Sequence, residues 1–145
     1  SACQKGGQWQ RALSLLEEMR LKRVTPSVVS FNAVLSACEA GGHWQHALLK
    51  LDEMRKEDVK PNLISYSTTI SACEKGRRWE RALVLLDKVR EAGLKHDLIS
   101  FSACISACEK CGQWQQALSL LEEMDQVCLD RDVINFNAAI SACEK

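Results

Sequence analysis

The chain of 145 residues is poor in helix-breaking residues, with two prolines and seven glycines, and it has no long hydrophobic run. The scarcity of proline and glycine excludes a collagen-like protein and a low-complexity linker. No apolar stretch approaches the roughly 18 residues that a transmembrane helix needs, so we expect no membrane span. Because 46% of the residues are hydrophobic, the chain can bury a core, which excludes an intrinsically disordered tail.

A net charge is also missing, since 19 Lys and Arg balance 19 Asp and Glu. This balance excludes a strongly basic nucleic-acid-binding domain and an acidic tail. The charges are nevertheless distributed unevenly. Residues 1–95 contain 16 basic and 11 acidic residues, a net charge of +5, whereas residues 96–145 contain 3 and 8, a net charge of −5. An anionic partner would therefore favour the first part of the chain.

The most informative feature of the sequence is an internal repeat of 35 residues. The tripeptide Ser-Ala-Cys begins at Ser1, Ser36, Ser71, Ser106 and Ser141, and tryptophan recurs at Trp9, Trp44, Trp79 and Trp114. The chain contains four such periods and five further residues, and it begins without methionine. We therefore expect a fragment of a longer array, with any targeting peptide outside it.

Each period contains two segments with helical spacing of apolar residues. In the first segment (A), Phe31, Val34, Leu35 and Cys38 are spaced i, i+3, i+4 and i+7, as on one face of a helix. After Gly41-Gly42, a second segment (B) has the same spacing at Trp44, Ala47, Leu48, Leu51 and Met54. We expect eight helices, with the Trp and Met ladder packed in the core. The predicted fold class is all-α, an α-solenoid of stacked helix-turn-helix repeats, because one helix pair cannot bury both faces alone.

The unit from Val28 to Asn62, with its Phe31-Asn32, Ala47-Leu48, Glu53-Met54 and Lys60-Pro61-Asn62 segments, resembles the pentatricopeptide repeat family in its unbroken 35-residue form. The resemblance covers complete units at 28–62, 63–97 and 98–132 and partial units at 1–27 and 133–145. It implies a right-handed superhelix that binds single-stranded RNA in a mitochondrion or chloroplast and serves RNA processing, stability, editing or translation. The departures from the family pattern fall in the loops, where Arg77 replaces a turn glycine, Arg23, Asp58 and Cys128 replace a loop glycine, and His96 and Arg131 replace a proline.

The resemblance also implies roles for three sets of residues. Two residues per unit would recognise one RNA base: Asn32 with Asn62, Ser67 with Asp97, Ser102 with Asp132, and Asn137 without a partner in the chain. Aliphatic residues near the start of each A helix would sandwich the bases: Val29, Ile64, Ile99 and Ile134. Lysines that close the A helices would face phosphates: Lys5, Lys75, Lys110 and Lys145, a series that Ala40 interrupts. The family's pairing rule then predicts that the three complete units read 5′-C-G-G-3′, with U as second choice at the first base.

Simpler interpretations stay open for the same residues. Ser27, Asn62, Asp97 and Asp132 are good N-cap residues directly before helix A, although Ser30, Ser65, Ser100 and Asn135 could cap equally well. Asn32 and its equivalents could lie on a solvated helix face, and the lysines could be ordinary surface charge beside neighbouring glutamates. The alternative function is a scaffold for protein partners, which helical solenoids often are.

The eight cysteines do not predict a disulfide framework. Five of them share one position of the buried face of helix A: Cys3, Cys38, Cys73, Cys108 and Cys143. Neighbouring A helices should lie about 8–10 Å apart, too far for disulfides, so we expect small buried thiols in a reducing compartment. Cys104, Cys108 and Cys111 have the spacing of a radical-SAM cluster motif, but no α/β pattern surrounds them, so we expect no metal.

The sequence contains no recurring constellation of catalytic residues. The histidines His43, His46 and His96 belong to no repeated group of carboxylates or cysteines, and no glycine-rich phosphate loop follows a strand. We therefore expect neither an enzyme nor a cofactor.

Overall fold

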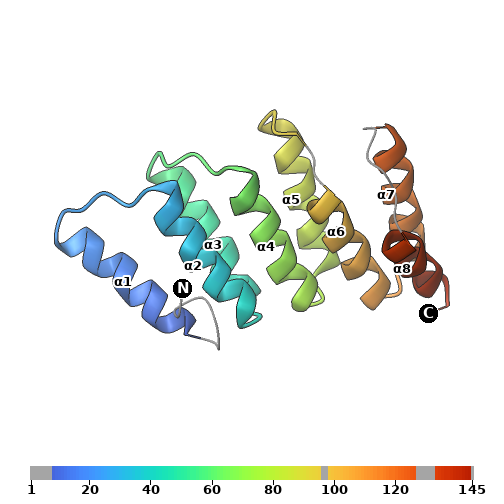
Figure 1. Cartoon of the computed structure of the whole chain (residues 1–145), viewed down its shortest axis with the longest axis horizontal. Coiled ribbons are helices and arrows are strands. Elements are labelled where there is room, and N and C mark those ends of the chain that lie inside the picture. The colour runs from blue at the N-terminus through green and yellow to red at the C-terminus, as the bar shows by residue number, and fades with distance from the viewer. Residues whose placement is uncertain (1–7, 96–97, 127–132, 145) are drawn as a thin grey trace.

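The computed structural model of the chain describes residues 8–95, 98–126 and 133–144, which form eight α-helices and no strand. The helices follow one another from one end of the molecule to the other (Figure 1). Their bounds are α1 Trp9–Leu21, α2 Val28–Ala40, α3 Trp44–Lys56, α4 Leu63–Lys75, α5 Trp79–Glu91, α6 Leu98–Lys110, α7 Trp114–Gln126 and α8 Val133–Cys143. The first is a B helix, three A/B pairs follow, and the last is an A helix, as the sequence predicts. None of the described helices is long and apolar enough to cross a membrane.

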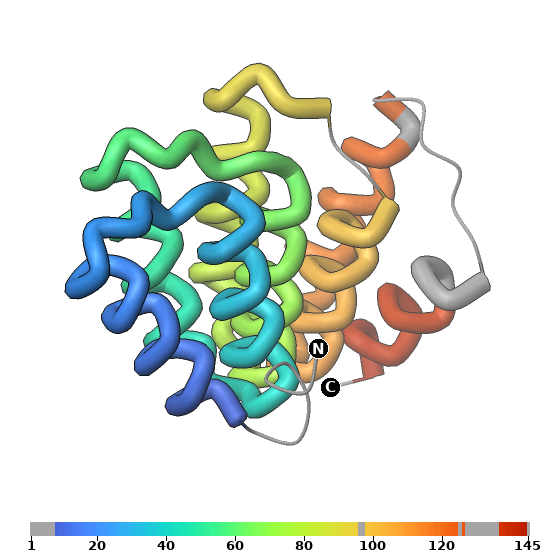
Figure 2. The backbone as a smooth tube through the Cα atoms, turned by 60° about the vertical axis from the view of Figure 1, so that its left-hand side comes forward, coloured from blue at the N-terminus to red at the C-terminus, as the bar shows by residue number. Residues whose placement is uncertain are grey.

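The helices form two layers, one of A helices and one of B helices. Figure 2 shows the helices stacked in chain order from the blue to the red end. The A helices α2, α4, α6 and α8 pack side by side, each on the next, and every B helix packs on the A helices that flank it in sequence. An inner A helix therefore packs on helices of both layers, whereas neighbouring B helices meet through side chains, as in the ion pair of Arg90 on α5 with Glu123 on α7. This arrangement confirms the all-α solenoid.

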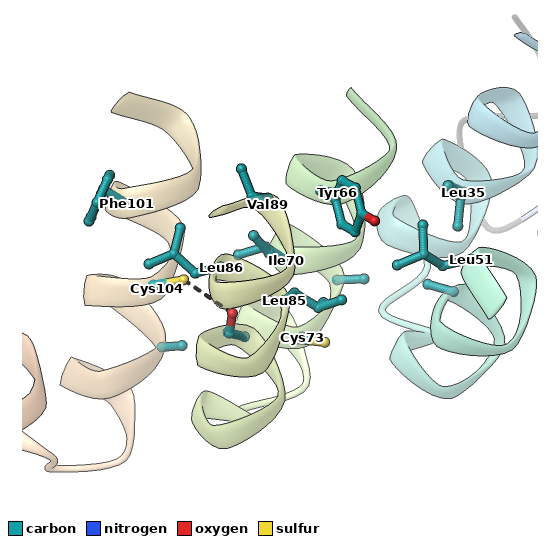
Figure 3. Packing of buried hydrophobic residues seen from close by; sticks show 14 of the residues in the cluster. Leu35, Leu51, Tyr66, Ile70, Cys73, Leu85, Leu86, Val89, Phe101 and Cys104 are labelled. Atoms are coloured by element: carbon teal, nitrogen blue, oxygen red, sulfur yellow. Dashed lines mark hydrogen bonds between the residues drawn. The ribbon is translucent and has the colours of Figure 1, made fainter. Parts of the chain in front are cut away.

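The core is continuous from repeat to repeat because the same positions are buried in each. The aromatic residue of the A helices, Phe31, Tyr66 or Phe101, is at most 4% exposed, and the B helices contribute Leu51, Leu85 and their equivalents. Figure 3 shows Ile70 of α4 and Leu85 and Leu86 of α5 directed into the space between the layers, with Cys104 Sγ of α6 directed at the carbonyl oxygen of Ala82, 3.5 Å away. The cohesion of the array thus comes from a layer of apolar side chains shared by adjacent repeats.

The tryptophans lie at the edge of this core, which differs from the expectation that they fill it. Trp9, Trp44 and Trp79 are only partly buried, and Trp114 is 44% exposed. The turn before the next B helix and the first residues of that helix cover the indole. His43 of the turn and His46 of α3 stack on Trp9 at centroid distances of 4.1 and 4.5 Å.

The turn after α4 covers Trp44 in the same way. The guanidinium carbon of Arg78 lies 4.8 Å from the indole centroid, and a Cβ at Gly76 would lie 2.3 Å from Trp44 Cδ1. The backbone at Gly76 therefore rests directly on the ring.

The buried cysteines behave as the sequence predicts in the interior of the array. Cys38, Cys73, Cys104 and Cys108 are buried free thiols. Burial raises the pKa of the Cys38 thiol to about 11 and the pKa of Cys73 and Cys108 to about 12, so these thiols are neutral at pH 7. Cys143 is exposed, contrary to the expectation; among the described helices, α8 packs on α6 and α7. Cys3 lies outside the described residues.

Candidate functional site

The beginnings of the A helices carry a row of aliphatic side chains that face solvent. Val29 is 74% exposed, Ile64 59% and Ile99 63%. Each is the second residue of its helix, so packing of the A helices places the three side chains at equivalent positions of neighbouring repeats. Exposed aliphatic groups that recur in register form an apolar surface available to a ligand. Ile134 is the second residue of α8, but its side chain lies outside the described part of the chain.

The first base-reading pair predicted from the sequence meets in the structure. Asn32 Nδ2, on α2, donates a hydrogen bond of 3.2 Å to Oδ1 of Asn62, the residue before α4. The two side chains are separated by 30 residues in sequence and lie together because α2 packs on α4. Both are partly exposed, and the first turns of α2 and α4 also carry the exposed side chains of Val29 and Ile64.

Asn62 also caps α4. Its Oδ1 accepts the backbone N–H of Ser65 at 3.1 Å, and the Ser65 hydroxyl oxygen accepts the backbone N–H of Asn62 at 3.2 Å. Ser27 and Ser30 form the same reciprocal capping box at the start of α2. The expectation that Ser30 and Ser65 could serve as N-caps in their place is wrong, because both are the third residue of their helix and complete the box.

A buried hydroxyl links the cap to the pair. Ser65 is 0% exposed, and its Oγ donates to Asn32 Oδ1 at 2.5 Å. Capping and pairing are thus parts of one hydrogen-bond network at Asn32, Asn62 and Ser65. Ser65 is a site residue that the sequence analysis treated only as a possible cap. Its recurrence as Ser30, Ser65 and Ser100 was the available signal.

The other predicted pairs are described in part. Ser67 is half-buried on α4, with its Oγ 3.3 Å from the carbonyl oxygen of Ile64, and Ser102 is half-buried on α6. Asn137 is exposed on α8. Asp97 and Asp132 lie outside the described residues, so the structure brings together only the pair of Asn32 and Asn62.

The lysines at the ends of the A helices are held by the preceding repeat. Lys75 Nζ lies 2.8 Å from Glu39 Oε1, and Lys110 Nζ lies 2.7 Å from Glu74 Oε1. Sequence reasoning paired these lysines with the glutamate beside them, whereas the partner comes from the neighbouring A helix. Lys5 and Lys145 lie outside the described residues.

Serines of the following A helix also donate hydrogen bonds to glutamates at this position of the repeat. Ser106 Oγ donates to Glu74 Oε1 at 2.7 Å, and Ser141 Oγ donates to Glu109 Oε1 at 2.6 Å. The contacts join consecutive A helices through a row of glutamates, which we call the glutamate ladder (Glu39, Glu74 and Glu109). The ladder leaves the lysine ammonium groups near the surface, with the side chains of Lys75 and Lys110 44% and 35% exposed.

Two other features of the described residues, the grouping of metal-binding side chains and a groove beside α1, offer no site. Within the described residues, no three His, Cys, Asp or Glu side chains are grouped so that they could hold a metal ion. A groove of about 440 Å³ lies between α1 and α2 and is lined mainly by apolar side chains such as Leu15, Leu16 and Met19. Its few polar residues make no cluster capable of chemistry.

Sequence models of one repeat family match the whole length of the chain. The model of the pentatricopeptide repeat domain matches residues 1–41 and 84–145, that of the PPR repeat family matches residues 26–75, and that of the PPR repeat matches residues 64–94. No curated protein sequence matches.

Solved structures share the arrangement of helices. The pentatricopeptide repeat protein PPR10 in complex with an 18-nt psaJ RNA element is 28% identical, with a TM-score of 0.77, over 94% of this chain. PPR10 from maize is 24% identical with a TM-score of 0.73 over 97% of this chain. In both cases the chain spans only 20% of the length of PPR10.

A further structure shows the fold at lower identity. The PPR domain of Arabidopsis thaliana protein-only RNase P 1, in complex with tRNA, is 18% identical with a TM-score of 0.86. The match covers 99% of this chain and 76% of that domain.

Proposed function

The chain belongs to the pentatricopeptide repeat family, and we propose that it binds single-stranded RNA along the beginnings of its A helices, one base per repeat. PPR10, which shares its helix arrangement, is seen with an 18-nt RNA element. The resemblance extends the proposal to an RNA of a mitochondrion or chloroplast. The chain would act by binding, without catalysis and without a cofactor.

The observation that carries the proposal is the pairing of Asn32 with Asn62, on helices whose first turns bear the exposed aliphatic side chains of Val29 and Ile64. An unpaired base offers two apolar faces and a polar edge. Val29 and Ile64 would contact the faces, and the two amides, 3.2 Å apart, would hydrogen-bond the edge. A purely capping role of Asn62 does not explain why its oxygen also binds Asn32 of the preceding helix.

The same positions in the next two repeats complete the proposed interface. Ser67 with Asp97 and Ser102 with Asp132 would each read guanine, while Ile99 and Ile134 continue the aliphatic row. Asn137 would begin the reading of a fourth base. The complete repeats would thus read 5′-C-G-G-3′, with uracil as second choice at the first base.

The proposed phosphate contacts are Lys75 and Lys110, with Lys5 and Lys145 at the equivalent positions of the outer units. In the structure Lys75 and Lys110 are neutralised in part by Glu39 and Glu74. Three bases at about 1–3 kcal/mol of discrimination each cannot specify a transcript, so we expect weak binding that falls with salt.

The test is a titration of single-stranded RNA at two salt concentrations, followed by a change of one reading residue. Ser67→Asn should move the preference of the middle repeat from guanine towards uracil, because the closing Asp97 is unchanged. Competition between strands containing CGG and CUG, with wild type and variant, measures the shift. If the wild type binds neither strand, or if the preference does not move, the serines and asparagines are caps and surface, and a protein-binding scaffold becomes the better account.

A further inference from the structure

The hydrogen bonds around Asn62 determine which atom of its amide faces the helix. The backbone N–H of Ser65 can only donate, so the atom of Asn62 that lies 3.1 Å from it is the oxygen, Oδ1. The Asn32 atom 3.2 Å from this oxygen must be a donor, Nδ2. The other atom of Asn32, Oδ1, then faces the Ser65 hydroxyl at 2.5 Å. The backbone N–H of Ser65 therefore fixes the orientation of the Asn62 amide, and the Ser65 hydroxyl together with Asn62 Oδ1 fixes that of the Asn32 amide.

The orientation leaves donors on the side away from Ser65. Asn62 Oδ1 accepts from Ser65 N and Asn32 Nδ2, and it lies 3.0 Å from Ser65 Oγ, whose single proton is directed at the nearer Asn32 Oδ1. Asn62 Nδ2 makes no hydrogen bond within the described part of the chain and is not enclosed by it. Asn32 Nδ2 has a second hydrogen besides the one directed at Asn62. A molecule that approaches between Val29 and Ile64 would thus meet N–H groups.

We propose that Ser65 is a positioning residue for base recognition: its buried hydroxyl holds Asn32 and Asn62 with their donors outward and so makes repeat 28–62 select cytosine over uracil. Cytosine is the RNA base whose Watson–Crick edge has two adjacent acceptors, N3 and O2. Uracil places the N3–H donor between its acceptors, and this donor would oppose the amide hydrogens. The inference rests on the proposed function, but it assigns the choice of base to a residue of the following repeat.

The burial of Ser65 supports this role. The side chain is 0% exposed on α4, so its hydroxyl has no access to water as a substitute partner. Without the hydroxyl, Asn32 Oδ1 loses its donor, and the Asn32 amide keeps the hydrogen bond from Nδ2 to Asn62 Oδ1, which allows the amide to rotate about that bond and expose its oxygen to a base. The pair would then present an acceptor besides its donors, and the preference for cytosine over uracil would weaken.

The experiment compares four single-stranded RNAs that contain XGG in unstructured flanks, where X is C, U, A or G. Competition at low salt gives the preference at X for the wild type, Ser65→Ala and Ser65→Thr. We expect the wild type to favour C over U by about fivefold or more, the low end for a well-placed base contact. In Ser65→Ala the ratio should fall to within about twofold, and in Ser65→Thr, which keeps a hydroxyl, it should recover.

Ser100→Ala is the matched control. Ser100 is also buried and is also the third residue of its helix, but the residue that closes the unit before it is Asp97, whose two carboxylate oxygens are equivalent. No amide orientation has to be held there, so Ser100→Ala should leave the preference for G in the middle repeat unchanged. A thermal melt of each variant verifies folding, and Ser65→Cys, with a weaker donor, replaces Ser65→Ala if the latter does not fold.

The outcomes separate the two proposals. If the wild type prefers C and Ser65→Ala or Ser65→Cys keeps the full preference, the role of Ser65 is refuted while RNA reading stands. Failure of Ser65→Thr to restore a lost preference would also refute it. If the wild type shows no preference at X, the proposed function itself fails, and the inference fails with it.

Discussion

Three residues other than glycine hold the left-handed conformation with which these helices end. Arg23, Asp58 and Arg77 have φ of 59°, 59° and 57°, close to the 71° of Gly42. At the end of α4 the N–H of Arg78 reaches the carbonyl oxygen of Cys73 at 2.8 Å, which closes the helix as in a Schellman motif. The loop geometry therefore survives the loss of the family glycine, and the substituted residue bears conformational strain.

Arg77→Gly should increase the free energy of unfolding by about 0.5–1 kcal/mol. A side chain in the left-handed region costs about 1–2 kcal/mol, and the greater freedom of glycine in the unfolded chain offsets about 0.4–1 kcal/mol of that gain. Denaturant melts at pH 7 measure the difference. Gly42→Ala is the control, because a Cβ there meets nothing within 4 Å, so it should lower stability by about 1 kcal/mol through the backbone alone. A destabilised Arg77→Gly would show that the arginine side chain makes an essential contact.

The A helices are joined to one another by polar contacts at both ends. At their beginnings Asn32, Asn62 and Ser65 form the network of the proposed reader, and at their ends the glutamate ladder binds Lys75 and Lys110. The two networks flank the buried apolar positions of the same helices. An A helix is thereby aligned with its neighbour at two points, which sets the step from one proposed base position to the next.

Glu74→Gln tests whether Lys110 is available to phosphate. The variant removes the charge that lies 2.7 Å from the ammonium, while an amide can still accept the hydroxyl of Ser106. We expect tighter binding of CGG-containing RNA and a slope of log K against log salt that is steeper by about 0.7, the value for one phosphate of a single strand. The free energy of unfolding should fall by about 1 kcal/mol, because the pair is only partly exposed and the amide keeps the hydrogen bond of Ser106.

Glu122→Gln, an exposed change on α7, is the charge-matched control and should alter the salt slope far less. Weaker binding by Glu74→Gln would contradict the phosphate role. It would indicate that the glutamate ladder contributes by spacing the repeats.

For the whole molecule, periodicity alone was sufficient to predict the layers. The spacing of Phe31, Val34, Leu35 and Cys38 predicts the buried face of α2, and all four are at most 4% exposed. The sequence did not predict the hydrogen bonds and ion pairs between side chains of neighbouring repeats. The bonds of Ser65 to Asn32 and of Lys110 to Glu74 join residues 33 and 36 positions apart, so they follow from how one A helix is seated on the next. The pattern of residues within one repeat does not determine how its A helix packs on the next A helix. The site itself was predicted through the family resemblance, since an asparagine on a helix face has no signature of its own.

The position of the tryptophans implies that the contribution of each one to the free energy of unfolding depends on whether a following turn covers its indole. Trp44 is covered by Gly76 and Arg78 of the following turn, whereas Trp114 is 44% exposed. In a solenoid, stability is close to a sum of terms between neighbours. The same substitution should therefore cost more inside the array than at its end.

Trp44→Ala should lower the free energy of unfolding by about 2–3 kcal/mol, less than the 3–5 kcal/mol typical of a fully buried aromatic residue, because the indole is only partly buried. Trp114→Ala should cost at least about 1 kcal/mol less, because the more exposed indole of Trp114 buries a smaller apolar area. Each Å² of buried apolar area contributes about 25 cal/mol to the free energy of unfolding. Denaturant melts followed by far-ultraviolet circular dichroism measure both variants against the wild type.

Part of the loss in Trp44→Ala comes from the cation–π contact with Arg78. The double variant Trp44→Ala/Arg78→Ala should therefore lose less than the sum of the two single losses, by about 0.5–1 kcal/mol. Equal costs for Trp44→Ala and Trp114→Ala would mean that the turn of the next repeat adds nothing, and that the apolar layer between A and B helices alone holds the array together.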